Sequence, residues 1–202
     1  MFFKPRSVAV IGASRNPERV GHVILRRMVE VGYPGELYPI NPRAEEILGL
    51  KCYPSVEDVP GSVELAIIAL RADMTPSALE EAARKGARGA IVISGGFSEI
   101  GNEQLEEELL EVARKYGVRV VGPNCLGVFD PKHRMDTLFL PEEVMPRPRP
   151  GEVSIITQSG SLGSTLLTMM RKERRGISKF VSYGNRLDVD EADLIRLSLI
   201  HI

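Results

Sequence analysis

The sequence has few of the residues that mark secreted disulfide-rich or zinc-binding proteins. Its 202 residues include no tryptophan, five tyrosines and two cysteines. Cys52 and Cys125 stand far apart and lack the spacing of metal ligands, so neither a disulfide framework nor a zinc site is expected. Because this cysteine usage suits a reducing compartment, we predict a cytoplasmic protein without a bound metal.

An excess of one charge and long apolar runs are also missing. Lys and Arg total 26 against 27 Asp and Glu, which gives a net charge of -1. Such a balance creates no overall field toward polyanions, so nucleic acid is not expected as a partner. No apolar run is long enough to span a bilayer, and residues 1–6 do not begin a signal peptide. We therefore predict no membrane insertion and no secretion.

Short β-branched runs instead alternate with amphipathic helical stretches along the chain. This alternation is typical of βαβ units that build a parallel sheet. The runs do not alternate apolar with polar residues, as expected for strands that helices cover on both faces. Helices are expected near residues 20–31, 75–85 and 102–116. Strands are predicted at residues 8–11, 37–40, 65–70, 90–93 and 118–121.

A proline-rich stretch divides the chain. Residues 131–150 contain prolines that disfavour helices and inner strands, so we predict a linker between a first domain, residues 1–130, and a second, residues 151–202. The second has strands at 153–157 and 180–182, a helix at 162–171 and another helix near Asp190. These elements are too few to close a core, so we expect a truncated domain that exposes apolar surface and associates into an oligomer.

The first predicted strand runs into a turn of small residues, 12–17, followed by a helix. Free amides at a helix N-terminus attract phosphate. Ser14 and Pro17 replace the second and third glycines of the dinucleotide fingerprint, and the second strand ends without the acidic residue that NAD requires. Arg43, helped by Lys51, suits instead the 2′-phosphate of NADP or the 3′-phosphate of CoA. The alternative is that Arg43 is a solvated surface charge.

Three further small-residue loops follow predicted strands, at residues 94–99, 122–127 and 157–163. Ligands of open α/β folds bind at the carboxyl edge of the sheet, where the first two of these loops belong, although each loop alone also fits ordinary turn chemistry. Cys125 is not expected to act as a nucleophile, because no histidine stands in a partner motif. The turn at Ser159–Ser161 differs from a hydrolase elbow and fits a second anion-binding helix terminus.

In their order and spacing, these motifs resemble the alpha subunit of ADP-forming acyl-CoA synthetases, relatives of the succinyl-CoA synthetase alpha subunit. The resemblance implies an α/β protein with a Rossmann-like CoA-binding domain on a parallel sheet, followed by the beginning of a flavodoxin-like ligase domain. It also implies a family reaction that interconverts acyl-CoA, ADP and phosphate with acid, CoA and ATP through a phosphorylated histidine. The motifs are Val10 to Ser14, Tyr38 to Pro42, Ser94 to Glu99, Gly122 to Gly127 and Gln158 to Ser161.

The resemblance also assigns residues. Ser159, Gly160 and Ser161 would head the helix that faces the phosphohistidine. The implied CoA-binding residues are Gly12, Ala13, Ser14, Arg15, Asn16, Asn41, Pro42, Arg43, Ser94, Gly95, Gly96, Asn124 and Cys125.

No residue of the sequence matches the family's phosphohistidine, so we expect no catalytic residue in this chain and no activity of the chain alone. ATP, ADP and Mg would bind to an ATP-grasp domain or beta subunit. Two other functions stay open: a stand-alone regulatory protein that binds CoA or a nucleotide, and an NADP-dependent oxidoreductase.

Overall fold

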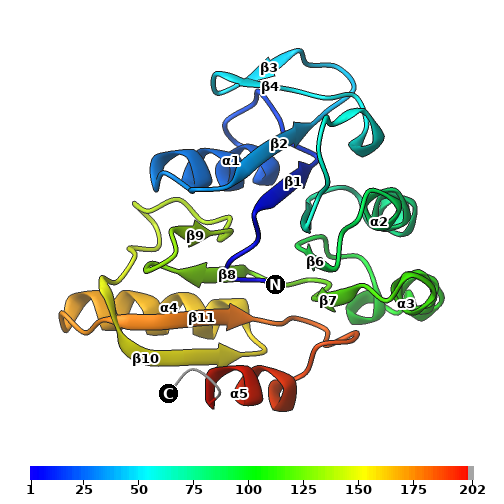
Figure 1. Ribbon diagram of the computed structural model, residues 1–202. Helices are drawn as coiled ribbons and strands as arrows, with labels where there is room; N and C mark the ends of the chain where they lie inside the picture. The colour runs from blue at the N-terminus through cyan, green and yellow to red at the C-terminus, as the bar shows by residue number, and fades with distance from the viewer. Residues whose placement is uncertain (200–202) are drawn as a thin grey trace.

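The computed structural model describes residues 1–199, and the last three residues of the predicted second domain lie outside this range. Five parallel strands form the first sheet in the order β2-β1-β5-β6-β7 (Figure 1). Every residue of the three central strands is buried, as their unbroken apolar runs predict. The strands are β1 (Ser7–Ile11), β2 (Glu36–Ile40), β5 (Leu65–Ile68), β6 (Gly89–Val92) and β7 (Arg119–Val121).

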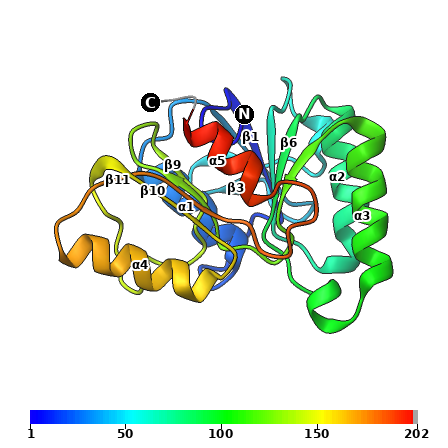
Figure 2. The same ribbon diagram turned by 90° about the horizontal axis from the view of Figure 1, so that it is seen from below.

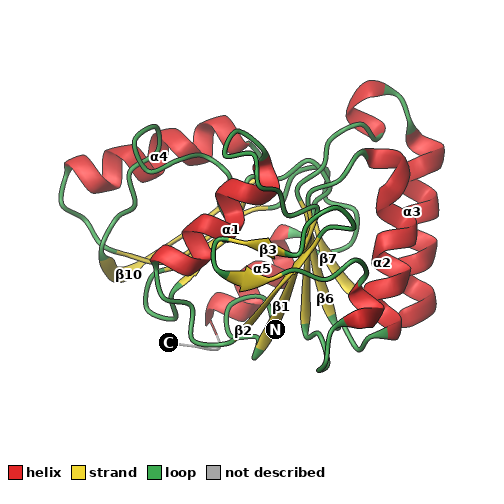
Figure 3. Cartoon of the chain, turned by 90° about the horizontal axis from the view of Figure 1, so that it is seen from above, coloured by secondary structure: helices red, strands yellow, loops and turns green. Residues whose placement is uncertain are grey.

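Helices cover both faces of this sheet. Val8 and Val10 of β1 face a cluster that includes Ile24 of α1 (Val20–Glu30). The alternate residues of β1 face the cluster under α2 (Thr75–Arg84) and α3 (Glu103–Tyr116), which lie on the opposite side of the sheet (Figure 3). A small antiparallel hairpin, β3 (Glu46–Ile47) and β4 (Leu50–Lys51), follows β2.

The second sheet is mixed and has the order β10-β11-β8-β9. β10 (Pro150–Thr157) and β11 (Ile177–Ser182) are parallel, whereas β8 (Gly127–Asp130) is antiparallel to β11 and β9 (Met135–Asp136) is antiparallel to β8. The helices α4 (Gly160–Lys172) and α5 (Glu191–Leu199) lie on opposite sides of this sheet (Figure 2). The α/β architecture and the parallel first sheet are thus as predicted.

The predicted linker is more ordered than its prolines suggest. It contains β9, and the buried Asp136 of β9 accepts hydrogen bonds from Arg27 Nε at 3.2 Å and Arg147 Nε at 2.9 Å. β8 lies within the predicted first domain but pairs with the second sheet. Between residues 131 and 149 there is no helix, and β9 is a two-residue edge strand, as the prolines predict. The domain boundaries at residues 130 and 150 remain predictions.

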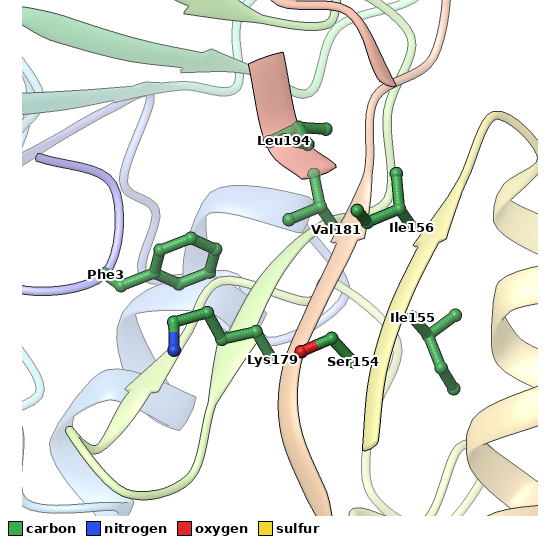
Figure 4. A pocket seen from close by; sticks show the side chains of 7 residues that line it. All are labelled: Phe3, Ser154, Ile155, Ile156, Lys179, Val181 and Leu194. Atoms are coloured by element: carbon green, nitrogen blue, oxygen red, sulfur yellow. The ribbon is translucent and has the colours of Figure 1, made fainter. Parts of the chain in front are cut away.

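The two sheets share a hydrophobic core. Val181 of β11 and Leu194 of α5 belong to the same buried cluster as Val8 and Ile24 of the first sheet. The N-terminal segment joins them, because Phe3 lies beside Val181 and Leu194 around a small apolar pocket (Figure 4). With a volume of about 10 Å³, this pocket has room for one water at most and serves packing rather than binding.

None of the helices within residues 1–199 combines the length and the apolar character that a membrane span needs.

Candidate functional site at the carboxyl edge of the first sheet

Two glycines shape the turn that follows β1. Gly12 has a φ of +93°, and a Cβ placed there would lie 2.5 Å from the carbonyl oxygen of Ala69. Gly21, in the first turn of α1, is closer still, since its Cβ would lie 2.1 Å from the carbonyl oxygen of Gly12. The close helix-to-turn packing that the third fingerprint glycine provides in dinucleotide-binding folds therefore comes from Gly21, a residue that the sequence reasoning missed.

Local hydrogen bonds fix the shape of this turn and leave some of its backbone N–H groups free. Ser14 Oγ accepts from the N–H of Asn16 at 3.1 Å, and Asn16 Oδ1 accepts from the N–H of Glu18 at 2.9 Å. Within residues 1–199, the N–H groups of Ser14 and Arg15 have no acceptor. Unpaired amides just ahead of a helix N-terminus are suited to an oxyanion.

Asn41 ties the end of β2 to the same turn. Its Nδ2 donates to the carbonyl oxygen of Ala13 at 2.7 Å, and its Oδ1 accepts from the N–H of Arg43 at 2.8 Å. The predicted pair of loops, residues 12–16 and 41–43, is therefore brought together by one asparagine. Pro42 lies in a turn between Asn41 and Arg43, which the N–H of Ala44 closes by donating to the carbonyl oxygen of Asn41 at 3.4 Å.

A surface hollow of about 410 Å³ lies beside this asparagine, between the end of β2 and the β3–β4 hairpin. Arg43 and Lys51 both line it, so the structure places these two cations at one hollow. Cys52 closes its floor, and burial raises the pKa of this thiol, so Cys52 stays uncharged. Arg15 lies against the same hairpin, with its Nε donating to the carbonyl oxygen of Glu46 at 3.3 Å.

The loops after β6 and β7 contact each other at the carboxyl edge. The N–H of Asn124 donates to the carbonyl oxygen of Ser94 at 2.8 Å, while Ser94 Oγ donates to the carbonyl oxygen of Leu70 at 2.6 Å. Gly95 faces the same asparagine, since a Cβ there would lie 3.3 Å from Asn124 Oδ1. The structure thus brings together Ser94, Gly95 and Asn124, as the sequence predicted for these loops.

Cys125 points into the protein. Its side chain is 2% exposed, and its Sγ donates to the carbonyl oxygen of Val92 at 3.2 Å. Burial raises the pKa of the thiol to about 12, so the reactive thiolate is absent at neutral pH. This geometry agrees with the expectation that Cys125 is not a nucleophile, and it leaves only backbone atoms of Cys125 for a ligand contact.

Asn185, in the loop after β11, is a central residue of the edge that sequence reasoning missed. Its N–H donates to the carbonyl oxygen of Pro123 at 2.9 Å, and its Oδ1 accepts from Asn124 Nδ2 at 3.3 Å. Its Nδ2 lies 2.6 Å from a carboxylate oxygen of Glu99 and 2.8 Å from one of Glu106. The only sequence signal was the pair Gly184-Asn185, which stands one residue beyond the end of a predicted strand and consists of turn-forming residues like those of the other loops.

Glu99 is held as a carboxylate by these contacts. Burial alone would raise its pKa, but hydrogen bonds from the Gly96 amide and from Asn185 outweigh burial and lower the pKa below 4.5. The loop at 94–99 is therefore fixed by an exposed, ionised side chain whose carboxylate accepts hydrogen bonds from the Gly96 amide and from Asn185.

The amino end of α4 meets the same edge. Ser159 caps the helix, with its Oγ accepting from the N–H of Leu162 at 3.2 Å, and lies 3.0 Å from Ser161 Oγ. A Cβ on Gly160 would lie 3.4 Å from the Cβ of Leu126, which places the helix start against the loop at 122–127. A second helix terminus suited to an anion therefore adjoins the end of the first sheet.

These loops lie within one conserved type of domain. The sequence profile described as "CoA binding domain" matches residues 6–131, which contain the loops after β1, β2, β6 and β7. The chain belongs to the CoA-binding domain family. A second profile, "succinyl-CoA ligase like flavodoxin domain", matches residues 150–199, so the CoA-binding domain is followed by part of a flavodoxin-like ligase domain as predicted.

Relatives of this chain include ADP-forming ligases. It is 41% identical over 199 residues to the alpha subunit of acetate–CoA ligase [ADP-forming] I from Pyrococcus furiosus, covering 96% of this chain and 42% of the relative. It is 43% identical over 195 residues to acetate–CoA ligase [ADP-forming] I from Archaeoglobus fulgidus, covering 28% of that protein. The chain thus spans less than half the length of these relatives and is homologous to their CoA-binding part.

Solved structures give the same result. The acetyl-coenzyme A synthetase 1 of Ca. Korarchaeum cryptofilum, in complex with phosphate and ADP, superimposes with a TM-score of 0.91 at 43% identity, over 97% of this chain and 41% of that one. An ATP citrate lyase from Methanothrix soehngenii shares the fold alone, with a TM-score of 0.73 at 16% identity.

Proposed function

We propose that this chain binds coenzyme A along the carboxyl edge of its first sheet and is the CoA-binding portion of an ADP-forming acyl-CoA synthetase. The complete reaction would interconvert acyl-CoA, ADP and phosphate with acid, CoA and ATP. The observation that carries the proposal is the joining of the Gly12 turn to the Arg43 and Lys51 hollow by Asn41. This arrangement offers amides to one phosphate and two cations to another, as the phosphorylated adenosine end of CoA requires.

The two phosphate-bearing parts of the adenosine end would be held by different groups. The free amides of Ser14 and Arg15 receive the diphosphate ahead of the amino end of α1, where the helix dipole favours negative charge. Arg43 and Lys51 contact the 3′-phosphate from the hollow that they line together. The guanidinium group of Arg43 is suited to bidentate contact with phosphate oxygens, whereas Lys51 adds a point charge.

The pantetheine arm would then run toward the loops after β6 and β7. Ser94, Gly95, Gly96 and Asn124 would line its path, with Cys125 contributing backbone atoms only. The amino end of α4 at Ser159–Ser161 would receive the phosphoryl group carried by a histidine that no residue of this sequence matches. ATP, ADP and magnesium would bind to an ATP-grasp module on a longer chain or a partner subunit, with which this chain would assemble.

Under this proposal the chain alone has no ligase activity, because the phosphohistidine and the nucleotide site belong to other segments. Its own residues bind the coenzyme, orient the thiol and present a helix terminus to phosphate. Its cytoplasmic location, predicted from the cysteine content, remains a prediction.

Calorimetric titration with CoA, dephospho-CoA and NADPH tests the proposal. We expect saturable binding of CoA, and binding about tenfold or more weaker for dephospho-CoA, because the charged hydrogen bonds to the 3′-phosphate are lost. Arg43→Ala should weaken CoA binding similarly while leaving the affinity for dephospho-CoA nearly unchanged.

The matched control is Arg88→Ala, which removes an exposed arginine from the opposite end of the first sheet, one residue before β6. This change should leave both affinities as they were. Equal affinities for CoA and dephospho-CoA would contradict the assigned pocket, and tight NADPH binding without CoA binding would support an oxidoreductase instead.

A further inference from the structure

Four arginines converge on a hollow at the amino ends of β10 and β11. Arg171, Arg174 and Arg175 come from the last turn of α4 and the turn after it, and Arg149 immediately precedes β10. Together they line a hollow of about 250 Å³. Since α4 has 13 residues, the hollow lies about 20 Å along the helix from Ser159, away from the proposed CoA edge.

The backbone fixes the two arginine-bearing segments against each other. The N–H of Ile177 donates to the carbonyl oxygen of Arg149 at 2.8 Å. Gly151 and Gly176 pack so tightly that a Cβ on Gly151 would lie 2.4 Å from the Cα of Gly176. The arrangement of the arginines therefore rests on paired backbone as well as on mobile side chains.

Arg174 occupies a position where glycine is usual. Its φ is +54°, in the left-handed region that closes many helices, and the following N–H, that of Arg175, donates to the carbonyl oxygen of Met170 at 2.8 Å. A long side chain in this region lowers stability compared with glycine. The guanidinium group that is kept there lines the hollow.

The positive charge of the hollow is not neutralised by the protein. Within the described part of the chain, no carboxylate oxygen lies within 4.0 Å of a guanidinium nitrogen of these four arginines, so none of them forms an ion pair. The nearest acidic residues along the chain, Glu152 and Glu173, line an adjoining hollow. Arg149, Arg174 and Arg175 line that hollow too, but neither glutamate forms an ion pair with them. Because the whole chain carries a net charge of -1, four unpaired cations in one place are a local feature that a bound anion would stabilise.

The charge and the donor geometry select a class of ligand. Guanidinium groups bind phosphate oxygens in pairs, and a single phosphate with a charge of about -1.5 to -2 would balance only half of the hollow. We propose that the hollow binds a diphosphate or triphosphate chain, supplied by an inorganic polyphosphate or by a nucleotide. This second site does not depend on the proposed binding of CoA.

Titration of the protein with inorganic tripolyphosphate, orthophosphate and ADP at one fixed ionic strength tests this proposal. We expect saturable binding of tripolyphosphate that is stronger than that of orthophosphate. The double substitution Arg171→Gln and Arg175→Gln should weaken it at least about tenfold, because several charged hydrogen bonds are lost. ADP binding with the same sensitivity would identify a nucleotide as a source, and ADP that fails to bind would leave the inorganic anion.

A matched variant removes two exposed arginines elsewhere, Arg88→Gln with Arg114→Gln, and so lowers the net charge equally. Arg114 also stands in the last turn of a helix. Tripolyphosphate binding should persist in this control, and CoA binding should persist in both double variants. Absence of saturable binding, or an equal loss of tripolyphosphate affinity in the two double variants, would overturn the proposal. Thermal unfolding without ligand should give similar midpoints, because all four substituted side chains are exposed.

Discussion

The two sheets differ in how completely they are covered. All five residues of β1 are buried, whereas four of the eight residues of β10 are exposed and only one is buried. Four large apolar side chains are exposed on β10, α4 and α5: Val153, Leu162, Met169 and Ile195. The longer first unit also exposes five, on its helices, loops and N-terminus: Met1, Val29, Leu48, Met74 and Ile100. Helices on both faces protect the first sheet within this chain, while the second sheet leaves an edge strand that further contacts can use.

The strongest test of this comparison lies at the junction of the two sheets. Asp136→Ala would leave Arg27 and Arg147 buried without their shared carboxylate. We expect the free energy of unfolding to fall by about 3 to 5 kcal/mol in urea titrations, the usual effect of breaking a buried ion pair. Because the sheets share a core, the loss should appear in one common transition.

An exposed ion pair provides the control for that substitution. Asp73→Ala removes the partner of Arg71 at the surface, where pairs contribute about 0 to 1 kcal/mol. Two separate transitions in the Asp136→Ala protein would show that the sheets unfold independently.

A matched pair of leucines sharpens the comparison of coverage. Leu79 of α2 is fully buried, and Leu162 of α4 is 53% exposed. Leu79→Ala should cost about 2 to 5 kcal/mol through the cavity it leaves, and Leu162→Ala should stay within about 0.5 kcal/mol. Urea unfolding of both variants checks this, and equal losses would show that the surface around Leu162 is covered in solution.

The smallest expected effect is a pH dependence at Glu99. Because its pKa is lowered in the folded protein, the carboxylate contributes stability that is complete above pH 4.5 and is lost as the pH falls through the lowered pKa. Glu99→Gln should therefore flatten the acid side of the stability profile, by less than about 1 kcal/mol for this exposed group. A wild-type profile that rises as the pH falls below 4.5 would contradict this assignment.

Local sequence signals predicted the elements and the loops of this protein well. β-branched runs placed the five strands of the first sheet, and small residues after them marked the turn at Gly12 and the loop at Ser94. Arg43 and Lys51, which follow β2 in the sequence, line one hollow, while their contact with a phosphate stays a prediction. Each of these features depends on residues close together in the chain, which periodicity and turn chemistry report.

The features that escaped prediction join distant segments. Asn185 contacts Glu99 across 86 residues, and Arg27 contacts Asp136 across 109. The pairing of β8 with β11 likewise depends on the tertiary fold. No pattern in a single sequence reports such contacts, so the role of Asn185 became visible only in three dimensions.

Gly184 gives this edge a fixed alignment. A side chain there would place its Cβ 2.1 Å from the carbonyl oxygen of Pro123. Gln158 Nε2 donates to the carbonyl oxygen of Gly184 at 3.3 Å. The loop from the second sheet is thus locked against the loop of the first, with the start of α4 attached to both. The relative position of the two loops therefore follows from packing within one polypeptide, so the proposed coenzyme would meet loops that are already aligned and would not have to order them.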